Sequence, residues 1–214
     1  MFAEKTMIID ASGRRVKAAL AENGKLAGAA QAREAALESL SDAACSLCED
    51  FSKVRAYAVC TGPGSMLGER CASAFASTLA RLFGAEIFEW DCMKAAAFFI
   101  SDKDGAPESF AIAAPSRKGF ANVLEMRGGK ILREEEVEIS ALENIPEKTK
   151  KYLLAQRDII PAGFENFEKI EMSAEDIFGT LNRHARLLSK CGEPPDAKAL
   201  SKREFVKWKA QAHT

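Results

Sequence analysis

The stretch AYAVCTGPGSMLGERCASAFASTLARLFG, residues 56–84, decides the fold. Its first five residues are apolar, which predicts a buried strand over 56–60. A glycine–proline turn follows, and then a run of apolar and small residues that predicts a helix over 65–83. Ser65 is the expected N-cap of this helix and Gly84 its C-cap. A strand that leads through a glycine turn into a long helix is typical of a layered α/β fold.

Strands and helices alternate on both sides of this stretch. Upstream, apolar segments predict three antiparallel strands, because Asn23-Gly24 is a strong hairpin signal. Downstream, a polar link at 101–109 with glycine and proline separates a second, more β-rich set of elements. Residues 140–172 are weakly patterned. The expected strands are 7–9, 16–20, 25–32, 56–60, 86–89, 110–114, 120–126, 131–139 and 158–160, and the expected helices are 33–51, 65–83, 92–100 and 174–190.

This order predicts two lobes and a tail. An N-terminal α/β lobe is expected over 1–103, a smaller C-terminal lobe over 104–190, and a tail over 191–214 that docks back on the first lobe. Trp208 indicates a docking point, because an exposed tryptophan is unfavourable. The tail is basic, and it either is solvated or contacts RNA or an acidic protein. Its basic residues are Lys198, Lys202, Arg203, Lys207 and Lys209.

Composition narrows the class of protein. The 30 Lys and Arg residues balance 31 Asp and Glu residues, and a net charge of -1 argues against a protein that coats nucleic acid. No secretory leader and no membrane-spanning run is expected, so the chain is predicted to be cytoplasmic. Only Cys45 and Cys48 are closely spaced among the six cysteines, and His184 and His213 lie far away, so free thiols are expected rather than a metal site.

The glycine turn has two interpretations. It lies between a strand and a helix, where backbone amides can hold a phosphate. However, Glu69 and Arg70 follow Gly68 where a Walker loop would have lysine and Ser or Thr, and the Rossmann spacing is absent. A tight structural turn is therefore favoured over a phosphate loop.

The helix behind the turn has two contrasting faces. Larger residues form the expected core stripe, and small residues fill the other face. The small face either meets another helix of the chain, is an alanine-rich solvent face, or is an intersubunit contact, and periodicity does not choose between these. The core stripe is Leu67, Cys71, Phe75, Thr78, Leu79 and Leu82, and the small face is Ala72, Ser73, Ala76, Ser77 and Ala80.

Two further segments could contact a ligand. Asp10 ends the first strand, where an acid can hold a metal through water or simply form a turn. The segment 116–119, Ser-Arg-Lys-Gly, is either a solvated turn or a phosphate contact. No catalytic triad is recognisable.

Three parts of the chain resemble the TsaB (YeaZ) family. Met7 to Asp10 followed by Val16 to Leu20 is similar to the family's opening strand, acid and hairpin, and 201–208 is similar to its closing segment. The third part resembles the family signature Gly-Pro-Gly-Ser-Phe-Thr-Gly-x-Arg. The matching residues there are Gly62, Pro63, Gly64, Ser65, Gly68 and Arg70.

The resemblance implies an actin/Hsp70-like (ribonuclease H-like) two-lobed fold. It implies that the chain is a non-catalytic subunit in the synthesis of threonylcarbamoyladenosine beside the anticodon of tRNA. Such a subunit binds the catalytic paralogue TsaD together with the ATPase TsaE. A helical bundle that includes the helix after the glycine turn makes this contact, self-dimers use a similar surface, and tRNA is reached only through the complex. The implied partner-binding residues are Leu67, Arg70, Ala72, Ser73, Ala76, Ser77 and Ala80.

The sequence also departs from the family pattern. Met66 and Leu67 replace Phe-Thr, Glu69 and Ala72 replace an aliphatic residue and a glycine, Ala35 replaces a common histidine, and 114–117 lack the usual Asp. A diverged member of the family is therefore expected. No cofactor is expected, and Asp10 is interpreted as part of a vestigial nucleotide site, for which weak nucleotide binding is left open. The alternative is a small-molecule kinase or nucleotide hydrolase of the same fold.

Overall fold

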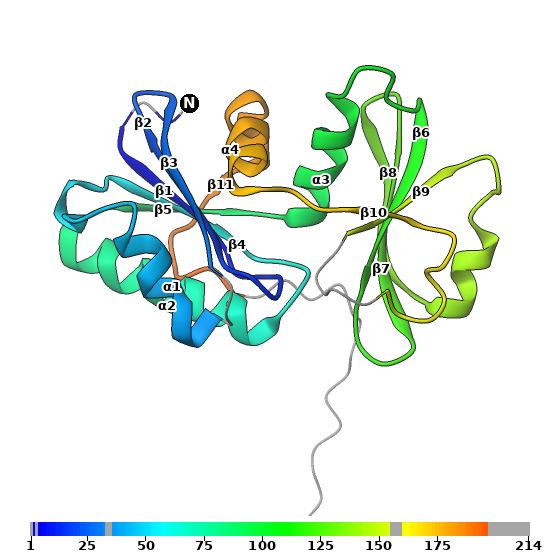
Figure 1. Cartoon of the computed structure of the whole chain (residues 1–214), viewed down its shortest axis with the longest axis horizontal. Helices are drawn as coiled ribbons and strands as arrows, with labels where there is room; N and C mark the ends of the chain where they lie inside the picture. Colours follow the sequence, from blue (N-terminus) through cyan, green and yellow to red (C-terminus); the bar gives the residue numbers. More distant parts are fainter. Residues whose placement is uncertain (1, 3, 33–35, 155–159, 197–214) are drawn as a thin grey trace, which may run out of the picture.

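Two lobes lie side by side, each built on its own sheet (Figure 1). This computed structural model describes residue 2 and residues 4–32, 36–154 and 160–196. The first lobe has a six-stranded sheet in the order β11-β5-β4-β1-β2-β3, and the second has a five-stranded sheet in the order β10-β9-β6-β7-β8. The expected two-lobed α/β fold with mixed sheets is confirmed.

The first sheet combines parallel and antiparallel strands. β1 pairs antiparallel with β2 and parallel with β4, and β4 pairs parallel with β5. Asn23 and Gly24 adopt φ values of 52° and 76°, so the predicted hairpin between β2 and β3 is confirmed. The strands are β1 (Thr6–Asp10), β2 (Lys17–Glu22), β3 (Lys25–Gln31), β4 (Ala56–Cys60), β5 (Glu86–Trp90) and β11 (Ser189–Lys190).

Helices cover both faces of the first sheet. α1 (Ala36–Cys45) and α2 (Met66–Phe83) pack on one face, and α3 (Cys92–Ser101) and α4 (Ala174–Arg183) lie on the other (Figure 1). The expectation of a helix over 33–51 is too long at its C-terminal end, because Phe51 lies in the separate 3-10 turn η1 (Phe51–Lys53). Asp50 caps η1 by accepting from the Ser52 amide.

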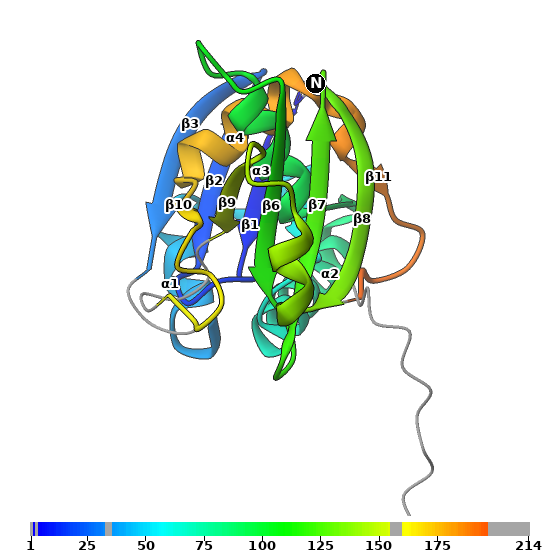
Figure 2. The ribbon, with the colours of Figure 1, turned by 90° about the vertical axis from the view of Figure 1, so that its right-hand side faces the viewer.

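The second sheet packs its inner face against α3, while the turn η2 and a loop with two buried phenylalanines cover its outer face. Figure 2 shows the helical segment after β8 crossing in front of the strands. Two of its strands were missed in the weakly patterned region, and the strand expected at 158–160 lies mostly outside the described residues. The elements are β6 (Ser109–Pro115), β7 (Phe120–Arg127), β8 (Lys130–Glu138), η2 (Ile139–Asn144), β9 (Lys150–Leu154) and β10 (Glu168–Ile170).

The chain returns to the first lobe earlier than expected. The helix predicted over 174–190 ends at Arg183, α4 contacts β2 and β3, and β11 pairs with β5. The assignment of 174–190 to the second lobe is therefore wrong, because α4 contacts strands of the first sheet and β11 is part of that sheet. Residues 191–196 also lie on the first lobe, and the rest of the expected docking tail, with Trp208, lies outside the described residues.

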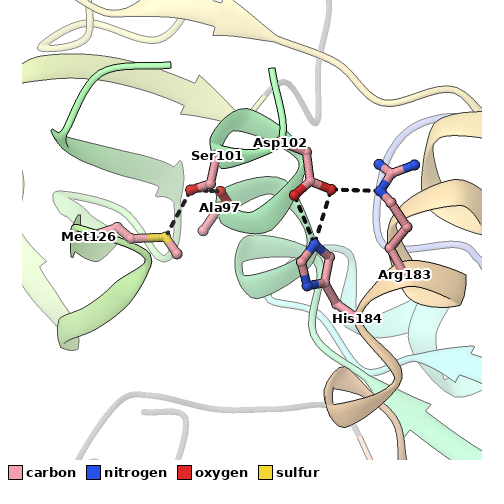
Figure 3. A network of polar contacts seen from close by, with 6 residues as sticks. All are labelled: Ala97, Ser101, Asp102, Met126, Arg183 and His184. Carbon is pink, nitrogen blue, oxygen red and sulfur yellow. Dashed lines mark hydrogen bonds and ion pairs between the residues drawn. The ribbon is translucent and has the colours of Figure 1, made fainter. Parts of the chain in front are cut away.

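A polar network fixes the end of α3 to the returning chain (Figure 3). Asp102 accepts a hydrogen bond of 2.7 Å from Arg183 Nε and lies 2.9 Å from His184 Nε2. The His184 ring stacks on Phe98 with centroids 4.7 Å apart. On the other side of α3, the Ser101 hydroxyl meets the Met126 sulfur of β7, so α3 is tied to both lobes.

Replacing Asp102 by Asn should weaken the attachment of α4. Partial burial opposes ionisation, but the hydrogen bonds from Arg183 and His184 outweigh it and hold the pKa of Asp102 below its usual value. We expect Asp102→Asn to lower the free energy of unfolding by about 0.5–1 kcal/mol at pH 7. A depressed carboxyl pKa stabilises above the pKa of the unfolded chain, so the difference should vanish as the pH falls below about 4.

Chemical denaturation of both forms from pH 3 to pH 7 measures this effect. Asp104→Asn makes the same charge change two residues further along, outside the network, and is the matched control. Equal losses from both substitutions would contradict a specific role for Asp102.

Candidate functional site

The glycine turn lies against the turn that follows β1. The Ser65 amide donates a 2.7 Å hydrogen bond to the Ser12 carbonyl. A Cβ on Gly64 would lie 2.3 Å from the Ser12 oxygen, and a Cβ on Gly68 would lie 2.0 Å from the Ala11 oxygen. Real Cβ atoms do not approach this closely, so both positions require glycine. The two glycines thus set where α2 begins relative to the sheet.

Two amides of this turn, those of Ser65 and Gly68, are used within the chain. Ser65 caps α2, because its hydroxyl accepts from the Gly68 amide at 3.2 Å, and its own amide is bonded to Ser12. Gly84 ends α2 in the left-handed conformation, as expected. These contacts support the structural interpretation of the turn over a phosphate loop, because a phosphate needs amides that are not engaged.

The small-residue face of α2 packs on the chain's own first sheet. Its five residues are all at most 9% exposed, and the three alanines join a core cluster with β1 and β4. Leu67 and Leu82, in contrast, are 60% and 69% exposed. The sequence-based assignment of the two faces is therefore wrong. Small side chains let the helix approach the sheet, which leaves Ala72, Ser73, Ala76, Ser77 and Ala80 covered by the chain itself.

The outer face of α2 is the part of the helix that a partner could reach. Of the implied partner-binding residues, only Leu67 and Arg70 are exposed. Exposed Ala74 and Thr78 continue this face along the helix. Beside this face, Phe75 of α2 makes an edge-to-face contact with Phe51 of η1, with ring centroids 6.0 Å apart. We call this surface the outer face of α2, and its exposed residues are Met66, Leu67, Arg70, Ala74, Thr78, Arg81 and Leu82.

Asp10 forms a turn at the end of β1. Its Oδ1 accepts from the Ser12 amide at 2.9 Å and from the Ser12 hydroxyl at 2.6 Å. It lines a cavity of about 20 Å³ between the lobes, together with Lys17 and Trp90. That space holds about one water molecule. In the described part of the chain, no group of three or more His, Cys, Asp or Glu side chains could hold a metal ion.

The segment 116–119 is engaged with its own lobe. The Ser116 hydroxyl donates to Glu136 at 2.7 Å, and Arg117 Nε donates to the other oxygen of Glu136 at 3.1 Å. The Arg117 guanidinium also lies 3.5 Å from the centre of the Phe120 ring. These contacts favour a structural turn over a phosphate contact.

Glu69 is the residue of this region that the sequence interpretation missed. It lies on the buried face of α2, is 4% exposed, and its Oε1 has no hydrogen-bond partner within the described residues. Burial, together with the negative charges of Asp10, Asp91 and Asp196, raises the pKa of Glu69 to about 8. Helical spacing places Glu69 on the same face as Ala72 and Ser73. Its burial could therefore have been predicted if the small-residue face had been assigned to the core.

Comparison with solved structures gives matches over nearly the whole chain. An uncharacterized protein from Pseudomonas aeruginosa with similarity to peptidase YEAZ superposes with a TM-score of 0.64 at 18% identity, covering 92% of this chain and 97% of its own. YeaZ from the same organism gives a TM-score of 0.62 at 17% identity, covering 86% and 94%. A partial match to MreB 5 of Spiroplasma citri has a TM-score of 0.37 at 13% identity, covering 65% and 54%.

The two matches to YeaZ-type structures show that the chain has the two-lobed fold of those proteins. Comparisons with protein-family models and with curated protein sequences give no match. Among the described residues, no helix has the length and apolar character that a membrane crossing requires.

Adding a methyl group at Gly68 should destabilise the protein. The new Cβ would overlap the Ala11 carbonyl oxygen, so the glycine turn or the turn after β1 must shift, at about 1–3 kcal/mol. Gly179→Ala is the matched control, because Gly179 also lies in a helix and its Cβ would meet only the flexible end of Arg183 at 3.4 Å. Thermal unfolding should show a loss for Gly68→Ala and a gain of about 0.5–1 kcal/mol for Gly179→Ala. A neutral Gly68→Ala would refute the close approach.

Replacing Glu69 by Gln should stabilise the protein in a pH-dependent way. The folded chain holds a proton on Glu69 up to about pH 8, whereas the unfolded chain loses it near pH 4.5. The folded form therefore binds more protons in this window, and its stability falls as the pH rises through it.

Denaturation of both forms between pH 4 and pH 9 tests this linkage. We expect the advantage of Glu69→Gln to grow from about pH 4.5 to about pH 8, by up to about 1.4 kcal/mol per pH unit, and then to level off. A constant difference across the range would contradict a protonated Glu69.

Proposed function

We propose that this chain is a non-catalytic partner subunit for the threonylcarbamoyl modification of tRNA adenosine next to the anticodon. It binds and organises a TsaD-type catalytic subunit, together with a TsaE-type ATPase, and meets tRNA only through that complex. The observation that carries the proposal is the likeness to two YeaZ-type structures over nearly the full length of both chains. The match of the glycine turn to the family signature supports it.

The outer face of α2 is the contact that we assign to the catalytic subunit. Met66 and Leu67 at the start of the helix and Leu82 at its end are each more than half exposed, so they offer apolar surface that a partner could bury. Ala74 and Thr78 between them are small enough to admit a second helix at close range. Self-association would use the same face and would compete with the partner.

A small-molecule kinase or nucleotide hydrolase of the same fold is the second candidate. The position of Asp10 in the cavity between the lobes favours it. Against it stand the negative charges of Asp10, Asp91 and Asp196 around Glu69, which would repel phosphates. Calorimetric titration with Mg-ATP distinguishes the two, since the partner-subunit proposal expects no saturable heat at micromolar concentrations.

Introducing arginine at position 67 should block assembly. Leu67→Arg places a long charged side chain at the start of the proposed helix contact, where it would lose water without gaining a partner. We expect capture of the TsaD-type subunit from the same genome to fall at least tenfold in a pull-down with purified proteins. Circular dichroism should show an unchanged fold.

Leu132→Arg is the matched control, because Leu132 is 58% exposed and lies on β8 of the other lobe. Equal capture by Leu67→Arg and the native chain would refute the assigned face. A folded native chain that captures no TsaD-type subunit would refute the proposed function itself.

A further inference from the structure

The last described segment of the chain crosses the small-residue face of α2. This strap, Gly192–Asp196, begins where the Cys191 amide donates to the Ile87 carbonyl at 2.9 Å. The Ser73 hydroxyl donates to the Pro195 carbonyl, and Pro195 is buried. The strap therefore covers Ser73 and closes one side of α2 from solvent.

Glu69 lies one helical turn before this crossing. It precedes Ser73 by four residues, so both side chains lie on the same face of α2. Its Oε1 is buried without a hydrogen-bond partner within the described residues, and it lies against the glycine turn, where a Cβ on Gly62 would come within 2.4 Å of it. The charge of Asp196, at the end of the strap, acts on the Glu69 carboxyl.

The groups around Glu69 come from several elements and are mainly acidic. Asp10 at the end of β1, Asp91 at the start of α3 and Asp196 on the strap all disfavour its ionisation. The buried thiol of Cys60, which is hydrogen-bonded to the free thiol of Cys92, stays neutral because burial raises its pKa well above the usual value. Lys17 on β2 pairs in register with Asp10 and lines the cavity on that side. No arrangement among the described residues could hold a metal ion here, so a proton is the cation that can neutralise Glu69.

We propose that Glu69 and the strap form a proton-controlled latch, in which Gly192–Asp196 lies on α2 while Glu69 carries a proton and lifts when that proton leaves. An ionised carboxylate in this position has no partner for Oε1 and faces three like charges, which is a costly arrangement in the interior. Lifting the strap carries Asp196 away and lets water reach Glu69. The proton passes to solvent, and the change is reversible.

The latch acts near neutral pH and exposes a defined surface. The pKa of Glu69, raised by burial and by its acidic neighbours to about 8, places the change between neutral and mildly alkaline conditions. Release uncovers Ser73. This inference does not depend on the identity of the partner that binds the outer face of α2.

Labelling of a thiol placed under the strap tests the latch. In a Ser73→Cys chain, a short iodoacetamide pulse followed by peptide mass spectrometry measures modification at position 73. The exposed Cys45 normalises for the pH dependence of thiol reactivity, and the buried Cys60 reports on global opening. We expect the ratio of labelling at position 73 to that at Cys45 to rise at least tenfold between pH 6.5 and pH 9, while Cys60 stays unmodified.

The same measurement with Glu69→Gln added separates the latch from general loosening. The ratio should then stay flat, because glutamine cannot ionise, and Asp196→Asn in place of Glu69→Gln should reduce the rise. A flat ratio in the chain that retains Glu69, or an equal rise with glutamine at position 69, would overturn the proposal. Protection at pH 9 restored by added Mg²⁺ would also overturn it, because a metal rather than a proton would then control the strap.

Discussion

The contact between the glycine turn and the turn after β1 is the constraint on which the first lobe depends. Two backbone oxygens, those of Ala11 and Ser12, occupy the space that side chains at positions 68 and 64 would need. Because the Ser65 amide is bonded to Ser12, the first turn of α2 is held directly against the end of β1. A helix held so close to the sheet can place only small residues beneath it. The alanines and serines of α2 are a consequence of this approach, and its larger residues must point sideways to α1 or outward.

This geometry explains which parts of the structure the sequence could predict. Apolar runs bounded by strong turn signals, such as Asn23-Gly24, identified the strands of the first sheet except β11, and its hairpin. The faces of α2 were inverted because periodicity shows that a helix has two faces, but the distance to its neighbour decides which face is buried. The strands β9, β10 and β11 have five, three and two residues, and their pairing depends on partners far along the chain. The return of α4 to the first sheet is likewise set by tertiary contacts.

The same constraint shapes the electrostatics of the site. The turn uses the Ser65 and Gly68 amides internally, which leaves fewer donors for an anion, and the charges of Asp10 and Asp91 act in the same region. Asp10 is likewise satisfied by Ser12. Asp10, Ser65 and Gly68 thus stabilise the local structure at the point where the first strand meets α2.

α2 therefore has two faces that can act together. Its outer face begins at Leu67 and its latched face at Glu69, so a partner and a proton would act on the same helical turn. If a partner bound on the outer face prefers the latched form of α2, it must raise the affinity of Glu69 for its proton, and the proton must raise the affinity of the partner by the same factor. If the partner binds both forms equally, pH cannot change its affinity, however tightly it binds. The pH dependence of assembly thus measures how far the first turn of α2 transmits a change from one face to the other.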